Sequence, residues 1–303
     1  MNSSPSSHIT RHTARDITLL TVGAVVISLS PILVKAIGQN ALGPTAIGFW
    51  RTLIGALGFL VLSLALKKQL RLTPRALKWA LLAGFFFAAD IFFWHRSIIY
   101  TGAGLATILG NTQVFGSAIL SYFLFKERLT VRFFVAATAA LLSVAMLVGV
   151  FSKNINFDDQ YIRGIVFGLI TGVAYAAYIV SLKKSGMDRS KPDTLVFMGY
   201  SCVVTAFFLG IIAAFEHYPM IPSNISSWLL LFALGVVVQI FGWWAIARTL
   251  SKIETHRASL ILLLQPTLAT LFGALIFHEH LDGIQSIGAA ITLTAIYLGS
   301  VRK

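Results

Sequence analysis

Ten long apolar runs constrain this chain more than any other feature of its sequence. A helix of about 20 apolar residues crosses the hydrocarbon core of a bilayer, which is roughly 30 Å thick. Lipid offers the backbone no hydrogen-bond partner, so spans of this length must be helical. The runs lie at 17–37, 44–66, 76–98, 104–125, 131–150, 164–182, 194–215, 227–248, 258–277 and 283–301. The sequence therefore predicts an all-α membrane protein with ten transmembrane helices.

Composition supports the same fold class. Of the 303 residues, 57% are hydrophobic and 12% are charged, whereas a soluble domain has roughly 25% charged residues. Cys202 is the only cysteine, which excludes a disulfide scaffold. Residues 1–16 form a polar tail. The apolar run after the tail lacks a convincing signal-peptide cleavage site, so we expect this run to be a membrane helix.

The positions of the basic residues predict the orientation. If the N-terminus lies inside, all but five of the 24 lysines and arginines fall on the cytoplasmic side. The five exceptions are Lys35, Arg51, Arg96, Lys153 and Arg163. The positive-inside rule then places both termini in the cytoplasm. It also explains the net charge of +13 without a nucleic-acid partner, because no basic face or stacking motif accompanies the charge.

The two halves of the chain resemble each other. At an offset of 152, Ala106-Thr107, Gln113 and Phe125-Lys126-Glu127-Arg128-Leu129 match Ala258-Ser259, Gln265 and Phe277-His278-Glu279-His280-Leu281. With a three-residue adjustment, Asp90 also matches Gln239, and Trp94 matches Trp243. Each copy holds five helices, an odd number, so the second copy must be inserted upside down. The sequence predicts an inverted 5+5 repeat in one membrane domain, with copies at 17–150 and 164–301, as in many secondary transporters.

Several short motifs point to a known family. They are Ser30-Pro31, Trp50-Arg51, Gln265-Pro266, Glu127-Arg128-Leu129 and Glu279-His280-Leu281. With the ten helices and the duplication, they resemble the drug/metabolite transporter (DMT) superfamily, specifically its ten-helix EamA-type members. In the fourth helix the family's proline is replaced by Gln113-Val114, so the resemblance does not imply a proline bend there.

The resemblance implies a transporter with a substrate cavity at the bilayer midplane. Helices one, three, four, six, eight and nine would line the cavity, with helices five and ten packed away from it. It also implies rocking between inward-open and outward-open states, and export of amino acids or related metabolites in many members. Cargo varies within the family, so the resemblance constrains the fold more than the substrate.

Asp90 is the only one of the 11 acidic residues placed deep inside an apolar run. A carboxylate within the membrane is costly and usually faces a cavity or a partner. Asp90 could therefore bind a substrate ammonium group or take up a coupling proton. It could also be a structural partner for a polar group on a neighbouring helix, and the sequence leaves these alternatives open.

Aromatic and amide side chains accompany Asp90. Trp94 follows it by four residues and shares its helix face, and the matched pair Gln239 and Trp243 has the same spacing. Such faces suit a midplane pocket for a flat or partly apolar ligand. The predicted substrate-binding residues are Asp90, Trp94, Asn111, Tyr175, Tyr178, Gln239, Trp243 and Gln265. Core packing is the alternative for the tyrosines, and adhesion between helices is the alternative for Gln265.

Four basic residues fall toward the outer ends of their helices: Lys35, Arg51, His95 and Arg96. They could form an external gate or steer a substrate carboxylate or phosphate. Snorkelling to the interface explains each of them separately. Glu127 and Glu279 are interpreted as helix-end contacts. We expect no cofactor and no metal, since the sequence has neither a cysteine pair nor an HExxH motif.

The leading prediction is a secondary transporter that works by alternating access and exports neutral or aromatic amino acids. The alternative is an importer or exchanger of nucleobase-, nucleotide-sugar- or S-adenosylmethionine-like metabolites. An intramembrane enzyme is disfavoured, because the helices offer Asp90 but no nucleophile with a base. The absence of a Walker A motif also disfavours a pump driven directly by ATP.

The expected surroundings are a lipid bilayer and a small-molecule substrate. Length and topology suit a multi-pass protein of a bacterial inner membrane. The sequence sets neither the substrate, the transport direction nor the coupling ion, for which a proton is one candidate. It also leaves open whether the protein is a monomer or a homodimer.

Overall fold

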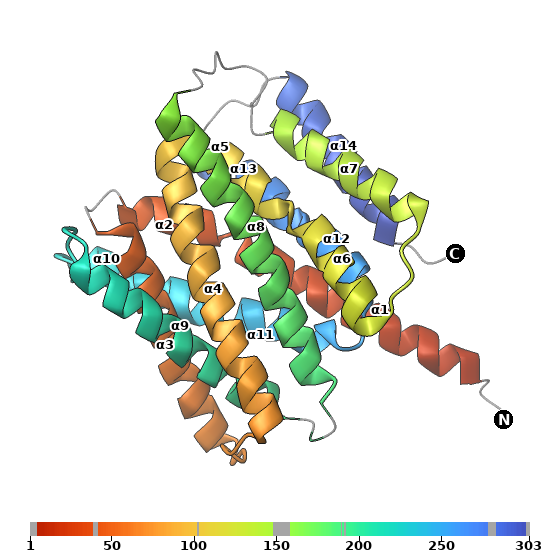
Figure 1. The fold of residues 1–303 in the computed structure, drawn as a ribbon, viewed down its shortest axis with the longest axis horizontal. Helices are drawn as coiled ribbons and strands as arrows, with labels where there is room; N and C mark the ends of the chain where they lie inside the picture. Colours follow the sequence, from red (N-terminus) through yellow and green to blue (C-terminus); the bar gives the residue numbers. More distant parts are fainter. Residues whose placement is uncertain are drawn as a thin grey trace.

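A computed structural model describes residues 5–38, 42–101, 103–147, 158–188, 190, 192–277 and 283–300. The described residues fold into helices, shown in Figure 1. In chain order these are α1 (Pro5–Ile27), α2 (Ser30–Gly38), α3 (Pro44–Ala65), α4 (Pro74–Thr101), α5 (Ala103–Asn111), α6 (Gln113–Phe125), α7 (Val131–Leu147), α8 (Asp159–Gly186), α9 (Thr194–Phe215), α10 (Ile225–Ala233), the π-helix η2 (Leu234–Gly242), α11 (Trp243–Leu250), α12 (Thr255–Leu262), α13 (Leu264–Phe277) and α14 (Gly283–Ser300).

Four groups of these helices each make up a single span: α1 with α2, α5 with α6, α10 with η2 and α11, and α12 with α13. Counted in this way, the described part of the chain contains the ten helical spans that the sequence predicts. Seven of them are long and apolar enough to cross a membrane on length and composition alone. Those seven are Ala14–Ile37, Pro44–Ala65, Pro74–Thr101, Leu105–Phe125, Asp159–Gly186, Thr194–Phe215 and Ile225–Leu250.

The outer surface of the bundle is apolar. Large side chains such as Val61, Phe123 and Phe207 are each more than 60% exposed, while many serines and threonines are buried between the helices. An extended apolar exterior of this kind needs lipid to cover it. The prediction of an all-helical, multi-pass membrane protein is confirmed.

The helix contacts keep their pattern when the two halves are exchanged. α3 packs on α9, and α7 packs on α14 at the edge of the molecule (Figure 1). The third span packs on the sixth through α4 and α8, and correspondingly the eighth packs on the first through α11 and α1. The fourth span packs on the sixth through α6 and α8, and the ninth on the first through α13 and α1. This pattern suggests a 5+5 arrangement.

Three spans are interrupted partway along their length. Pro31 supplies no backbone N–H, and the first span breaks between Ile27 and Ser30, just before it. The ninth span breaks at Leu263, three residues before Pro266. The fourth span breaks at Thr112 although no proline is present. At each interruption a backbone N–H bonds three residues back instead of four: Leu29 to Val26 O, Thr112 to Leu109 O and Leu263 to Leu260 O.

The break at Thr112 was not expected from the missing proline, and its cause is local. The Thr112 backbone N–H donates to Leu109 O at 3.1 Å, and its hydroxyl donates to the same carbonyl at 2.6 Å. Side-chain bonds of this type bend helices. α8 approaches the break at Gly172, where a Cβ atom would collide with Thr112 Oγ1 and lie 3.0 Å from Leu109 O. Only glycine permits this approach.

Gly172→Val should therefore lower the thermal stability of the purified protein in detergent, because the added side chain must push α8 away from the break. Overpacking of this kind costs about 1–3 kcal/mol. Gly283→Ala is the control, since nothing lies within 4 Å of a Cβ atom there. Melting is measured by size-exclusion chromatography of heated samples. Equal melting temperatures for Gly172→Val and the wild type would contradict the close packing.

Candidate functional site

A cavity lies between the two halves of the molecule. Its volume is about 110 Å³, and since one water molecule needs roughly 10–15 Å³ of such space, the cavity can hold a small organic molecule. Its wall is formed by Ile27, Ser28, Ser30, Pro31, Arg51, Phe87, Asp90, Ile91, Trp94, Thr107, Gly110, Asn111, Thr171, Tyr175, Trp243, Gln265 and Pro266. The lining helices are those that the family resemblance implies, with the addition of α3, which contributes Arg51.

The carboxylate of Asp90 lines this cavity from α4. Among the described residues, none donates a hydrogen bond to it and none forms an ion pair with it within 4.0 Å. A carboxylate inside a membrane protein normally has a partner. The side chain is therefore placed to receive a donor from a molecule in the cavity.

Arg51 also lines the cavity and is only 7% exposed. Its Nε donates to Gln239 Oε1 at 2.8 Å, and its Nη1 donates to Ser30 Oγ at 3.0 Å. The guanidinium carbon lies 5.6 Å from the ring centroid of Phe87. Arg51 and Asp90 attract each other electrostatically without touching. The sequence predicted Arg51 as part of an outer gate or as a guide for a substrate carboxylate or phosphate, and the structure places it in the cavity wall.

Three predicted aromatic residues line the cavity: Trp94, Tyr175 and Trp243. Tyr178 does not reach the lining and is fully buried. Its ring stacks on Phe87 with centroids 4.6 Å apart and meets Trp243 edge-on at 4.9 Å. Together Phe87, Tyr178 and Trp243 form an aromatic floor, of which Tyr178 is the supporting member.

The three amide side chains predicted to bind substrate differ in whether they reach the cavity lining. Asn111 and Gln265 line the cavity. Asn111 Nδ2 donates to Thr107 O at 2.8 Å, and Gln265 Nε2 donates to the Tyr175 hydroxyl at 3.1 Å. Gln239 lies behind the lining, where its Oε1 accepts from Arg51 and its Nε2 donates to Cys202 Sγ at 3.3 Å. Gln239 thus contacts the cavity only through Arg51.

The π-helix η2 explains why Gln239 and Trp243 are not a pair like Asp90 and Trp94. Residues four apart share a face only in an α-helix. In η2 the Trp243 N–H bonds five residues back, to Val238 O, so the turn is wider. Gln239 consequently faces Arg51, while Trp243 faces the cavity.

The other basic candidates lie outside the cavity lining. Arg96 Nη2 pairs with Glu216 Oε1 at 2.6 Å, and the hydroxyl of Thr45 donates to the same oxygen at 2.9 Å. His95 is 5% exposed, and its Nδ1 has no hydrogen-bond partner among the described residues. Lys35 is exposed near the end of α2. The predicted steering cluster is therefore distributed over different contacts.

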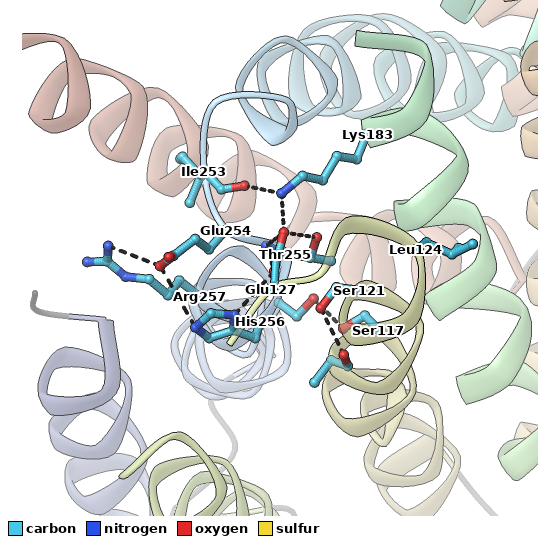
Figure 2. A network of polar contacts seen from close by, with 12 residues as sticks. Ser117, Ser121, Leu124, Glu127, Lys183, Ile253, Glu254, Thr255, His256 and Arg257 are labelled. Atoms are coloured by element: carbon cyan, nitrogen blue, oxygen red, sulfur yellow. Dashed lines mark hydrogen bonds and ion pairs between the residues drawn. The ribbon is translucent and has the colours of Figure 1, made fainter. Parts of the chain in front are cut away.

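A second polar site joins three helices (Figure 2). Glu127 Oε1 accepts from Lys183 Nζ at 2.5 Å and from the Thr255 hydroxyl at 3.0 Å. Its Oε2 accepts from the Thr255 backbone N–H at 2.8 Å and lies 3.3 Å from His256 Nδ1. We call Glu127, Lys183, Thr255 and His256 the Glu127 clasp. It connects the end of α6 to the end of α8 and the start of α12.

The Glu127 clasp stabilises a carboxylate. Burial acts to raise the pKa of Glu127, but hydrogen bonds from His256, Lys183 and Thr255 outweigh it and hold the pKa at about 2, below the ordinary value of 4.5. Glu127 is therefore negatively charged at neutral pH. The sequence identified a helix-end contact at Glu127 but not Lys183 as its partner; its matched residue, Glu279, lies outside the described residues.

α8 relates the two sites to each other. Tyr175 lines the cavity, Tyr178 supports the aromatic floor, and Lys183 belongs to the Glu127 clasp. At 1.5 Å per residue, the eight residues from Tyr175 to Lys183 span about 12 Å. The aromatic floor and the Glu127 clasp thus follow the cavity wall one after the other along α8.

A helical membrane bundle around a largely apolar cavity that contains a carboxyl group and a guanidinium group has the architecture of a transporter, and the sequence relationships agree. The profile of the EamA-like transporter family matches residues 15–149 and 162–301. These two matches cover most of the chain, so the protein belongs to the EamA-like transporter family of the DMT superfamily. It is a transporter family and not an enzyme family.

Named relatives are distant. An "Uncharacterized transporter" of Clostridium kluyveri is 24% identical over 92% of this chain and 89% of its own length. The "Uncharacterized inner membrane transporter YhbE" of Escherichia coli is 25% identical over 86% of this chain and 78% of its own. A "Probable amino-acid metabolite efflux pump" of Escherichia coli is 24% identical over 65% of this chain and 67% of its own.

A solved crystal structure has the same fold. It superposes with a TM-score of 0.81 at 18% identity and covers 95% of this chain and 98% of its own.

Glu127→Gln should destabilise the protein at neutral pH, because the neutral amide cannot replace a carboxylate bonded to Lys183. Hydrogen bonds to charged groups contribute about 1.5–3 kcal/mol. The depressed pKa means that this contribution is complete above about pH 4.5 and is lost as the pH falls toward about 2. Thermal unfolding in detergent should therefore show a large difference from the wild type at neutral pH and a smaller one near pH 3.

Glu254→Gln is the matched control, since that side chain is 55% exposed and its contacts are longer. A difference from the wild type that does not shrink in acid would contradict the role of the Glu127 charge.

Proposed function

We propose that this protein is a secondary transporter that exports neutral or aromatic amino acids by alternating access. The observation that carries the proposal is the carboxylate of Asp90, which faces the central cavity without a donor from the described residues. An ammonium group is its natural complement. Trp94, Tyr175 and Trp243 offer ring surfaces for an apolar or aromatic side chain.

The names of two relatives support amino acids as the cargo. Proteins of Escherichia coli and Salmonella typhimurium, both 24% identical to this chain, are named probable amino-acid metabolite efflux pumps. The inner-membrane location of the YhbE relative supports a bacterial plasma membrane as the site of action. The missing partner of Asp90 favours a binding role, or uptake of a coupling proton, over a structural lock.

The side of the membrane on which the cavity is closed follows if both termini are cytoplasmic, as the distribution of basic residues predicts. The ends of α6 and α8 and the start of α12 then lie on the cytoplasmic side, where the aromatic floor and the Glu127 clasp close the cavity. Loading from the cytoplasm requires both closures to open. An inverted 5+5 repeat would supply this motion by rocking one half against the other.

Asp90→Asn should abolish or uncouple transport, because the amide cannot pair with an ammonium group or exchange a proton. Bacteria that express each variant are fed a dipeptide mixture, and free amino acids are measured in cells and medium over time. Asp159→Asn provides the same change at an exposed position at the start of α8. Undiminished export by Asp90→Asn, with a normal size-exclusion profile, would remove Asp90 from the pathway.

The same assay tests the cargo. Accumulation of nucleobases or S-adenosyl compounds inside cells that express the wild type, with amino acids unchanged, would replace the exporter proposal by the importer alternative.

The proposed cytoplasmic closure can be probed with a thiol reagent. Ser117 is buried, and its hydroxyl donates to Ser259 Oγ at 2.6 Å between α6 and α12. The cysteine of a Ser117→Cys variant should react slowly with the reagent. The reaction should be at least several-fold faster when Ser117→Cys is combined with Glu127→Gln, because the Glu127 clasp no longer holds the three helices together. Cys202 is buried and can remain in place.

Glu254→Gln is the control for this labelling experiment. Equal labelling rates with and without Glu127→Gln would show that the Glu127 clasp does not close the cytoplasmic side.

A further inference from the structure

Two opposite charges line one cavity without meeting. We propose that the cavity binds a zwitterion end to end, with Arg51 holding its carboxylate and Asp90 holding its ammonium group. This inference rests on the proposed transport of amino acids and adds the residue that recognises the second charge. It makes Arg51 a specificity-determining residue and not an outer gate.

The donor inventory of Arg51 supports this assignment. A guanidinium group has five N–H donors, and the protein uses one on Nε and one on Nη1. Nη2 makes no hydrogen bond to the described residues. It is also not one of their fully buried polar atoms, so part of its surface is accessible. It therefore reaches the open space of the cavity that Arg51 lines. The free donors are those that a carboxylate engages in a two-pronged contact.

The surroundings of Arg51 keep it in position and away from Asp90. Gln239 and Ser30 hold two of its nitrogens, and Cys202 in turn contacts Gln239. Gly55 makes room for Gln239, because a Cβ atom there would lie 2.6 Å from Gln239 Cγ. The guanidinium is thus fixed before a ligand arrives, and the gap to Asp90 remains open. Preorganisation of this kind lowers the cost of binding.

Electrostatics favour a ligand that carries both charges. A buried charged group without an opposite charge in contact is unfavourable, and among the described residues neither Asp90 nor Arg51 has one. An amine would form an ion pair with Asp90 only, and a carboxylate would form one with Arg51 only. A zwitterion forms both ion pairs at once and adds no net charge to the cavity. Its side chain then lies beside the rings of Trp94, Tyr175 and Trp243.

Four ligands test the inference on the wild-type protein. Phenylalanine carries both charges, phenylalaninamide lacks the carboxylate, 3-phenylpropionate lacks the ammonium group, and phenethylamine carries the amine alone. Binding to the purified protein in nanodiscs is measured by isothermal titration calorimetry at neutral pH. Phenylalanine should bind at least about tenfold more tightly than each analogue, since each analogue leaves one charged group without its partner.

The possible failures are distinguishable. If phenylalaninamide binds as tightly as phenylalanine, Arg51 does not recognise a carboxylate; the inference is then wrong, while the proposed amino-acid export stands. If neither phenylalanine nor leucine binds, and the cells export no amino acid, the proposed function fails and the inference fails with it.

Variants assign each preference to a residue. Arg51→Gln should abolish the preference for phenylalanine over phenylalaninamide, and Asp90→Asn should abolish the preference for phenylalanine over 3-phenylpropionate. Arg128→Gln, a change at an exposed position after α6, should leave both ratios intact. A ratio of affinities within one variant does not depend on how much of it is folded. Arg51→Gln with an undiminished preference would overturn the assignment, and if Arg51→Gln does not fold, the wild-type ligand series decides.

Discussion

Inside a bilayer, polar groups must find their partners within the protein, and the irregular segments of the helices in this chain lie around one cavity. The first, fourth and ninth spans break near mid-length, and the eighth contains a π-helix. Residues within two positions of each irregularity line the cavity: Ser28, Asn111, Trp243 and Gln265. The irregular backbone thus lies beside a cavity that a polar ligand or water can occupy, and the regular helices α3, α4 and α8 complete the cavity wall.

The same constraint relates the cavity to the Glu127 clasp. In the clasp, each oxygen of one carboxylate meets donors from other helices, so the buried charge is fully compensated. In the cavity, Asp90 and Arg51 are left partly uncompensated by the protein. The complete network holds helices together, and the incomplete pair is available to a ligand. Side chains of similar chemistry therefore have different uses, depending on how many partners the fold supplies.

Sequence reasoning succeeded where periodicity and motif spacing were sufficient. It predicted the ten helical spans and the EamA family, and the structure brings Asp90, Trp94, Asn111, Tyr175, Trp243 and Gln265 to one cavity. It assumed an α-helical period in the eighth span, so it placed Gln239 beside Trp243 and missed the contact with Arg51. It also missed the break at Thr112, which depends on a hydroxyl and on a glycine of another helix. Contacts between distant segments, such as Glu127 with Lys183, carry no local signal.

Two polar atoms of the aromatic floor have no hydrogen-bond partner among the described residues: the Tyr178 hydroxyl and Trp243 Nε1. Each such atom costs a folded protein about 1–3 kcal/mol. A conformation that admits water beside these rings would recover part of that free energy. The unsatisfied atoms therefore destabilise the conformation in which the aromatic floor is packed without water. In the proposed transport cycle, the closed form would be held by the ion pair between Glu127 and Lys183 and opposed by these unsatisfied groups, of which Tyr178 lies five residues before Lys183 on α8. Such opposition would bring the two conformations closer in free energy, and a small molecule that binds one of them more tightly would then shift the population toward it.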